Sequence, residues 1–194
     1  RVKPTQRDPH ARSSSDARQD PLRPGDLLLA DPFMSDPSFE RSVVLVLHTD
    51  LEGQEGLGLV LNRRLPGELP GSPYRSGGPV EIDTWFALEL HNLHSSRVEL
   101  RFTQLGDDRA LEGYQGELLN ESALQTFRAY FRGYAGWSPG QLQEELTQKA
   151  WILCRCGFDW FSSMDQDDLW SSLLIGMGGE YAAMARYPRH PNLN

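Results

Sequence analysis

The chain has 194 residues, of which 39% are hydrophobic and 24% are charged, and its formal net charge at pH 7 is −8. This composition is typical of a globular protein, and the length suits one domain with or without a tail. The longest apolar run, Val43–Leu47, is far shorter than the ~20 residues that span a bilayer, so we expect no association with a membrane.

Residues 1–24 differ in composition from the rest of the chain. They are rich in Arg, Ser, Asp, Gln and Pro, and such a segment buries too little apolar surface to offset the entropy that it loses on ordering. We therefore predict a flexible basic tail or a docked arm in residues 1–24 and a single folded domain in residues 25–194. No apolar stretch typical of a signal peptide is visible, so we expect a cytoplasmic protein.

The charge is distributed unevenly between these two parts. Residues 1–25 contain six basic and three acidic residues, a net charge of +3. Because the whole chain carries −8, residues 26–194 carry −11. A domain this acidic repels a phosphate backbone unless its bases gather on one face. Tight binding of DNA by the folded domain is therefore not expected, and the basic tail is the only feature that favours it.

The first part of the domain has the patterns of β-strands. Ser42–Thr49 is a β-branched, apolar run that suits a central strand, and the Gly- and Glu-containing residues 50–56 suit a hairpin turn. Residues 64–78 contain three Pro and four Gly, which predicts a loop. The other predicted strands are Asp26–Ala30, Leu57–Leu61, Trp85–Leu90, Val98–Leu105 and Ala150–Cys156.

Helices are predicted later in the chain. Ser122–Tyr134 has apolar residues at spacings of three and four, an amphipathic stripe that predicts a helix ending near two glycines. A Ser-Pro-Gly-Gln sequence at residues 138–141 then starts a second helix that reaches Gln148. Asp167–Gly176 is predicted as a third helix, and Glu180–Ala185 as a short helical turn. Because strands precede helices without strict alternation, the sequence favours an α+β fold.

The sequence contains none of the common catalytic signatures. The nucleophile elbow, the phosphate-binding loop and the dinucleotide fingerprint are all absent, so we expect a protein that is not an enzyme. His91 and His94 are three apart and would point to opposite faces of a strand, so we expect neither a metal site nor a cofactor. Cys154 and Cys156 would share one face of a strand, where a disulfide between them would be strained; we interpret them as reduced core residues.

The segment Gly133–Leu142 is the most unusual stretch and has two interpretations. As a structural element, it is a sharp turn between two helices in which Trp137 packs against the core. As a functional element, it is a ligand platform in which Trp137 offers a stacking face and the amides at the start of the next helix bind an anion. The first interpretation is favoured.

Several short motifs of this chain resemble those of the YqgE/AlgH family. The resemblance covers about residues 25–194 in the correct order, and its motifs are Gly25-x-Leu27-Leu28-x-Ala30, Asp36-Pro37-x-Phe39-x-Arg41-Ser42-Val43, Gly58-Leu59-Val60-Leu61-Asn62-Arg63, Gly77-Gly78-Pro79-Val80, Leu90-His91, Gly133-Tyr134-Ala135-Gly136-Trp137, Pro139-Gly140-Gln141-Leu142, Glu145-Leu146, Ala150-Trp151, Trp170, Gly176 and Pro191-x-Leu193-Asn194. Within these motifs we predict mainly structural roles for Gly133, Tyr134, Gly136, Trp137, Pro139, Gly140, Gln141 and Trp151.

The resemblance implies a fold and a cellular context. It implies an α+β fold whose strongly bent, bifurcated sheet closes into a pseudo-barrel flanked by helices, in a bacterial cytosolic protein. The family has no established enzymatic activity, and one branch is described as a transcriptional regulator of alginate synthesis. This chain departs from the usual pattern at Arg64, Gln143 and Lys149. It also lacks the Cys that some members carry in the strand matching Ser42–Thr49, so a redox role for that strand does not carry over.

Two functions follow as hypotheses. The first is a non-enzymatic regulatory or interaction protein, a monomer or weak dimer with an unknown protein or small-molecule partner. The second is a small-ligand or anion-binding protein, whose candidate ligand-binding residues are Arg41, Asn62, Arg63, Gly77, Gly78 and His91. The alternative for Arg41 is an ion pair with an acidic residue such as Asp36.

Overall fold

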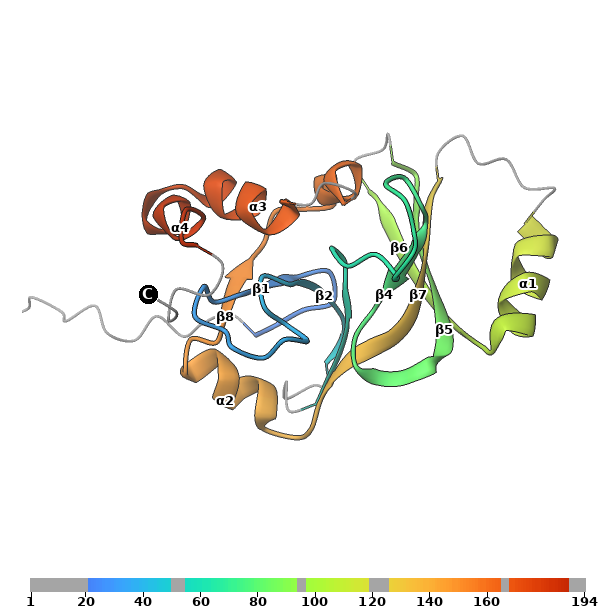
Figure 1. The fold of residues 1–194 in the computed structure, drawn as a ribbon, viewed down its shortest axis with the longest axis horizontal. Coiled ribbons are helices and arrows are strands. Elements are labelled where there is room, and N and C mark those ends of the chain that lie inside the picture. Colours follow the sequence, from blue (N-terminus) through green and yellow to red (C-terminus); the bar gives the residue numbers. More distant parts are fainter. Residues whose placement is uncertain (1–20, 50–54, 94–96, 119–125, 165–167, 189–194) are drawn as a thin grey trace, which may run out of the picture.

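A computed structural model of the chain describes residues 21–49, 55–93, 97–118, 126–164 and 168–188 (Figure 1). Eight strands in these residues form one sheet: β1 Leu27–Ala30, β2 Val43–Thr49, β3 Gly56–Val60, β4 Tyr74–Ser76, β5 Val80–His91, β6 Glu99–Gly106, β7 Thr126–Trp137 and β8 Trp151–Cys154. The described helices are α1 Asp108–Glu117, α2 Gln141–Thr147, a 3₁₀ helix Asp159–Ser163, α3 Leu169–Met177 and α4 Gly179–Met184. None of these helices is long and apolar enough to cross a bilayer.

The predicted α+β class is confirmed, and so is the bifurcated sheet. The strand order is β6-β5-β7-β3-β2-β1-β8, with β4 paired to β7 outside this path. One side of β7 pairs with β5, whereas the other side pairs with β4 over Tyr130–Arg132 and with β3 over Ala135–Trp137. The sheet therefore divides along β7. It curls without closing, so β6 and β8 remain edge strands of the part described.

Glycines permit the close approach of chains at the point where the sheet divides. Gly78 has a φ of +150°, and a Cβ built on it would lie 2.2 Å from the carbonyl oxygen of Tyr134. A Cβ on Gly77 would lie 2.2 Å from the carbonyl oxygen of Gly133. Only residues without a side chain fit here, which accounts for the Gly-Gly motif in physical terms.

Most of the predicted elements are confirmed, but the helix predicted for Ser122–Tyr134 is wrong where the structure describes it. Residues 126–137 form β7, because Phe127, Ala129 and Phe131 also alternate with polar residues and β5 offers an antiparallel partner along most of the strand. Residues 122–125 lie outside the described residues, as do residues 1–20 of the predicted tail, residues 50–54 of the predicted turn and His94.

Three further expectations need correction. The turn in Gly133–Leu142 joins a strand to a helix, not two helices. The loop predicted for residues 64–78 contains the short strand β4, and α1 was not predicted, because Leu111 is its only buried residue. The two cysteines of the C-x-C pair are not both core residues. Both thiols are free, but Cys154 is buried and Cys156 is exposed, since β8 ends at Cys154.

Both faces of β1, β2 and β3 are covered. Leu27, Leu29 and Val43 belong to the core that α3 and the 3₁₀ helix complete, whereas Leu28 and Val44 belong to the core under α2. This double burial explains why these strands read as continuous apolar runs. Figure 1 shows α2 on one side of β8 and α3 with α4 on the other, while α1 lies apart beside β5.

Candidate functional site

Three of the predicted ligand-binding residues lie together. Arg41, Asn62 and Arg63 line a polar hollow of about 260 Å³, together with Glu40, Asp168, Trp170 and Ser171. The hollow lies where the loop before β2 meets the residues after β3 and the start of α3. The predicted convergence of these three side chains is therefore present in the structure.

The side chains of Asn62 and Arg63 form hydrogen bonds with main-chain groups of the same protein. Asn62 accepts a hydrogen bond from the Val43 amide (2.9 Å) and donates one to the Arg41 carbonyl (2.8 Å). Arg63 donates to the carbonyls of Pro37 (2.8 Å) and Glu40 (3.0 Å). Burial lowers the pKa of Arg63, and the nearby carboxylates of Glu40 and Asp36 partly offset this effect. These contacts fix the loop before β2 to the end of β3.

Arg41 links the same loop to the C-terminal helices. Its guanidinium lies 4.7 Å from the centre of the Trp170 ring and donates a hydrogen bond to the Tyr187 carbonyl. The backbone of Arg41 has a φ of +52°, a conformation that residues other than glycine rarely adopt. Two carboxylates, Glu40 and Asp168, share the hollow and oppose the entry of an anion. We call the cluster of Arg41, Asn62 and Arg63 the polar latch, because its side chains hold neighbouring segments of the chain together. These contacts suit that structural role better than they suit an open anion-binding site.

The other predicted residues lie elsewhere. The Gly77 amide donates to the Arg132 carbonyl (2.8 Å), and the Gly77 carbonyl accepts from the Val60 amide (2.8 Å). Gly77 and Gly78 therefore belong to the point where the sheet divides, and they do not line the hollow at Arg41. Sequence reasoning placed them near one end of the β2–β3 hairpin. Gly77 does lie beside Val60 at the end of β3, but neither glycine lines the hollow.

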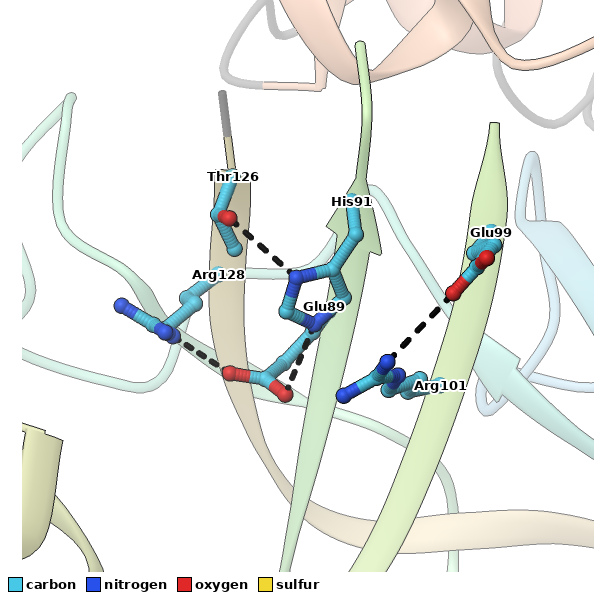
Figure 2. A network of polar contacts seen from close by, with 6 residues as sticks. All are labelled: Glu89, His91, Glu99, Arg101, Thr126 and Arg128. Atoms are coloured by element: carbon cyan, nitrogen blue, oxygen red, sulfur yellow. Dashed lines mark hydrogen bonds and ion pairs between the residues drawn. The ribbon is translucent and has the colours of Figure 1, made fainter. Parts of the chain in front are cut away.

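His91 belongs to a separate polar network on β5 and β7 (Figure 2). Its Nε2 lies 3.2 Å from a carboxylate oxygen of Glu89, and its Nδ1 lies 3.2 Å from the Thr126 hydroxyl. The other Glu89 oxygen accepts a hydrogen bond from Arg128. Glu89 is only 7% exposed. Burial raises the pKa of Glu89, but the hydrogen bonds and positive charges of Arg128 and His91 outweigh burial, and the net shift is downward.

This network resembles a hydroxyl–imidazole–carboxylate relay only in its order of groups. A relay needs a carboxylate that is free to stabilise an imidazolium, whereas the Glu89 carboxylate is shared with Arg128. Burial and the adjacent Glu89 also raise the pKa of Tyr114, on α1, to about 12. The network ties β5, β7 and α1 together. Sequence reasoning identified only His91, although a charged Glu89 inside an apolar strand was an available signal.

A larger hollow, of about 670 Å³, follows the outer edge of β8, and no sequence pattern predicted it. One wall is α2 with Leu142 and Leu146, and the other wall is α4 with Tyr181 and Met184. Residues 151–153 form its floor. Pro21, Leu22, Asp31, Gln143, Lys149 and Glu180 complete the lining. We call this hollow the β8 groove.

The main chain of β8 offers unused hydrogen-bonding groups to this groove. Among the described residues β8 pairs only with β1, and the Asp31 amide donates to the Ala150 carbonyl (2.9 Å). The main-chain amides and carbonyls of successive residues in an antiparallel strand point alternately to its two edges. Those of Ile152 therefore point toward β1, and those of Trp151 and Leu153 point away from it. The amides and carbonyls of Trp151 and Leu153 have no backbone partner on the groove side among the hydrogen bonds of the described chain.

The residues of the Gly133–Leu142 segment hold the α2 wall of the groove in place. One Glu145 oxygen accepts hydrogen bonds from the indole nitrogens of Trp137 (2.8 Å) and Trp151 (2.7 Å), and the two rings meet edge to face. Gln141 donates to the other Glu145 oxygen (2.9 Å), and Gly140 at the start of α2 has a φ of +79°. Because Trp137 is only 6% exposed, its ring is packed and offers no open face for stacking.

These features define a class of protein: an α+β domain with a curled, bifurcated sheet, a polar latch and an open sheet edge between two helices. The chain belongs to the AlgH-like family, which matches residues 27–182.

Relatives and solved structures agree with this assignment. A UPF0301 protein of Streptomyces coelicolor is 37% identical over 186 residues, which cover 88% of this chain and 94% of the relative. A UPF0301 protein of Bacteroides fragilis is 30% identical over 184 residues, covering 88% and 90%. Both names leave activity and substrate unstated.

Two solved structures share the fold. The solution structure of AlgH from Pseudomonas aeruginosa has a TM-score of 0.56 and 25% identity, and the match covers 86% of this chain and 94% of that one. The crystal structure of protein DIP2367 from Corynebacterium diphtheriae has a TM-score of 0.61 and 18% identity, covering 87% and 95%.

Proposed function

We propose that this chain is a non-enzymatic interaction protein that binds an extended segment of a protein partner in the β8 groove. The observation that carries the proposal concerns the main-chain amides and carbonyls of Trp151 and Leu153. Among the described residues they have no backbone partner on the groove side, and they lie at the floor of a groove walled by two helices. An added strand would take up these amides and carbonyls, and the apolar side chains of the walls would select its residues.

The family's regulatory connection fits an indirect mechanism. The net charge of −11 on residues 26–194 disfavours contact with a phosphate backbone, so we propose that any effect on transcription passes through a protein partner. We further propose a bacterial cytosolic protein that is a monomer or weak dimer and acts without a cofactor or a membrane.

The alternative, an anion-binding protein, has weaker support. The guanidinium groups of Arg41 and Arg63 line one hollow, which favours it, but both donate to backbone carbonyls and two carboxylates lie beside them. A ligand would have to displace contacts that hold the loop before β2. We therefore place the binding function at the β8 groove.

Substitutions at Leu153 test the proposal. A random-sequence peptide library displayed on phage would be selected against the full chain, and the recovered peptides would be measured on Leu153→Pro and Leu153→Ala. Leu153→Pro removes the amide that faces the groove without touching a bond to β1, whereas the matched control Leu153→Ala keeps that amide. We expect peptides that bind the wild type and Leu153→Ala and lose at least about tenfold in affinity on Leu153→Pro, the equivalent of one hydrogen bond. Equal binding to all three proteins, or no selected peptide at all, would refute the proposal.

A further inference from the structure

We infer that Cys154 and Cys156 form a reversible dithiol–disulfide site that reacts with low-molecular-weight disulfides such as oxidised glutathione. Cys156 takes up the incoming disulfide, and Cys154 displaces it and leaves a bond between the two cysteines. The inference goes beyond the proposed binding function and does not depend on it, because neither cysteine lines the β8 groove.

The two cysteines lie at the end of β8 with their side chains on the same side of the chain. Between them, Arg155 binds the Asp26 carboxylate (3.1 Å) and the Pro21 carbonyl (3.0 Å), so the residues before and after it point the other way. The two thiols share a hydrogen bond, and neither belongs to a disulfide. The sulfurs are therefore already neighbours, and a bond between them requires only a local change of the main chain.

Only one of the two cysteines belongs to the strand. A disulfide between residues two apart on a regular strand would be strained. However, β8 ends at Cys154, and Gly157, with a φ of +69°, turns the chain directly after Cys156. The strain expected from strand geometry therefore does not extend to Cys156.

The pair combines an accessible thiol with a buried one. Cys156 is exposed, whereas Cys154 is only 3% exposed and belongs to the core that α3 completes. The hydrogen bond from Cys154 lowers the pKa of Cys156 to about 7, and the thiolate that this favours is the attacking form of a thiol. Redox-sensing cysteines have the same features: an accessible thiol of low pKa lies beside a second thiol that displaces the first product.

The reaction consists of two balanced steps. The Cys156 thiolate attacks one sulfur of the small disulfide RSSR, which forms a mixed disulfide and releases the thiolate RS⁻. The Cys154 thiol then gives its proton to the released thiolate, attacks the Cys156 sulfur and expels the second RS⁻. The two cysteines lose two electrons, and the small disulfide gains them and becomes one thiol and one thiolate. An excess of small thiol reverses both steps.

A metal site explains this pair less well. Two thiolates do not complete the four ligands of a structural zinc site. Within the described ranges, no group of three or more His, Cys, Asp or Glu side chains is placed to hold an ion. The charges of Asp26 and Asp159 act on the pair and oppose ionisation of the thiols, and neither carboxylate completes such a group. The arrangement therefore favours disulfide exchange over metal binding.

Thiol counting in the full chain tests the inference. The wild type, Cys154→Ala and Cys156→Ala would be incubated with oxidised glutathione at neutral pH, unfolded in the presence of N-ethylmaleimide and weighed by mass spectrometry. We expect wild-type chains with neither glutathione nor label, because both thiols are in the disulfide, and Cys154→Ala chains with one stable glutathione. Cys156→Ala should react at least about tenfold more slowly than Cys154→Ala, because its remaining thiol is buried. Dithiothreitol should restore both labels in the wild type.

The wild type decides the inference even if a variant does not fold. One glutathione and one label on the wild type would show that Cys154 does not displace the adduct, and two labels would show that Cys156 does not react. Either result would overturn the inference. A disulfide between two copies, seen as a doubled mass that dithiothreitol abolishes, would overturn it as well, and so would equal rates for the two variants. The phage-selected peptides are measured with both thiols reduced, so the groove function stands or fails separately.

Discussion

At the scale of single residues, Trp137 is the best-supported structural anchor. Its ring is 6% exposed, and its nitrogen binds Glu145, which also holds Trp151. We predict that Trp137→Ala lowers the free energy of unfolding by roughly 3–5 kcal/mol, the range for truncating a core aromatic. Trp137→Phe, the control, keeps most of the packing and should cost less. A denaturant melt that shows a loss under ~1 kcal/mol for Trp137→Ala would contradict the buried position.

Arg41 has a structural prediction of its own. Its stacking on Trp170 and its bond to the Tyr187 carbonyl connect the loop before β2 to the C-terminal helices. Arg41→Gln should cost about 1–2 kcal/mol and lower the melting temperature by roughly 2–8 °C. The exposed pair of Arg101 with Glu99 supplies the control, because Arg101→Gln should change the melting temperature little.

The same two variants decide on the anion site. Calorimetry with inorganic phosphate should give no saturable heat with the wild type, because the donors of Arg41 and Arg63 are engaged within the chain. Saturable heat with the wild type that disappears in Arg41→Gln and persists in Arg101→Gln would restore the anion-binding alternative.

Cys156 gives a prediction about pH. A hydrogen bond from Cys154 lowers the pKa of the Cys156 thiol to about 7, whereas desolvation by the neighbouring chain and the charge of Asp159 oppose this shift. The Cys154 pKa is raised by the same pairing and by burial. The rate of alkylation by iodoacetamide should therefore reach half its maximum near pH 7, since the thiolate is the reactive form. In Cys154→Ala the midpoint should move up; an unchanged midpoint would show that Cys154 is not the cause.

At the scale of elements, the division of the sheet at β7 depends on a contact that only glycine permits. Gly78→Ala would place a Cβ 2.2 Å from the Tyr134 backbone, so β7 and the turn must separate. We predict a loss of at least ~2 kcal/mol in the free energy of unfolding. Gly71→Ala separates this steric effect from backbone strain, because Gly71 also has a positive φ (+88°) but no atom within 4 Å of the added Cβ. Gly71→Ala should lower the free energy of unfolding by only about 1 kcal/mol. Equal losses would remove the steric explanation.

The elements also show how far sequence patterns reach. β2 and α3 were predictable because local sequence and burial agree. Val43–Thr49 begins with a continuous apolar run that is buried on both faces, and Leu169–Met177 has buried Trp170 and Leu174 at a helical spacing. β7 was not, since Phe127 and Phe131 satisfy a helical spacing as well as an alternating one, and pairing with β5 decides between them. The polar latch was partly predictable, because Arg41 and Arg63 flank one hairpin. The β8 groove was not, since α2, α4 and β8 meet only through long-range packing.

At the scale of the whole molecule, charge separates the candidate modes of regulation. The folded part carries −11, and residues 1–25 carry +3. Duplex DNA carries a negative charge every ~1.7 Å, so the domain would have to overcome repulsion before making any specific contact. We predict no binding of duplex DNA below a micromolar dissociation constant by the full chain in gel shifts at physiological salt, where specific DNA-binding proteins reach about 10⁻⁸ M or tighter.

The basic segment supplies the control for this prediction. A weak shift that disappears when Arg7, Arg12 and Arg18 are replaced by Gln, or when salt is raised, would be non-specific attraction by the N-terminal residues, because such binding depends steeply on salt. A sequence-specific nanomolar shift that survives these replacements would contradict the prediction. It would require the folded domain to present a basic face despite its net charge, and direct regulation at DNA would then replace the partner-mediated function proposed for the β8 groove.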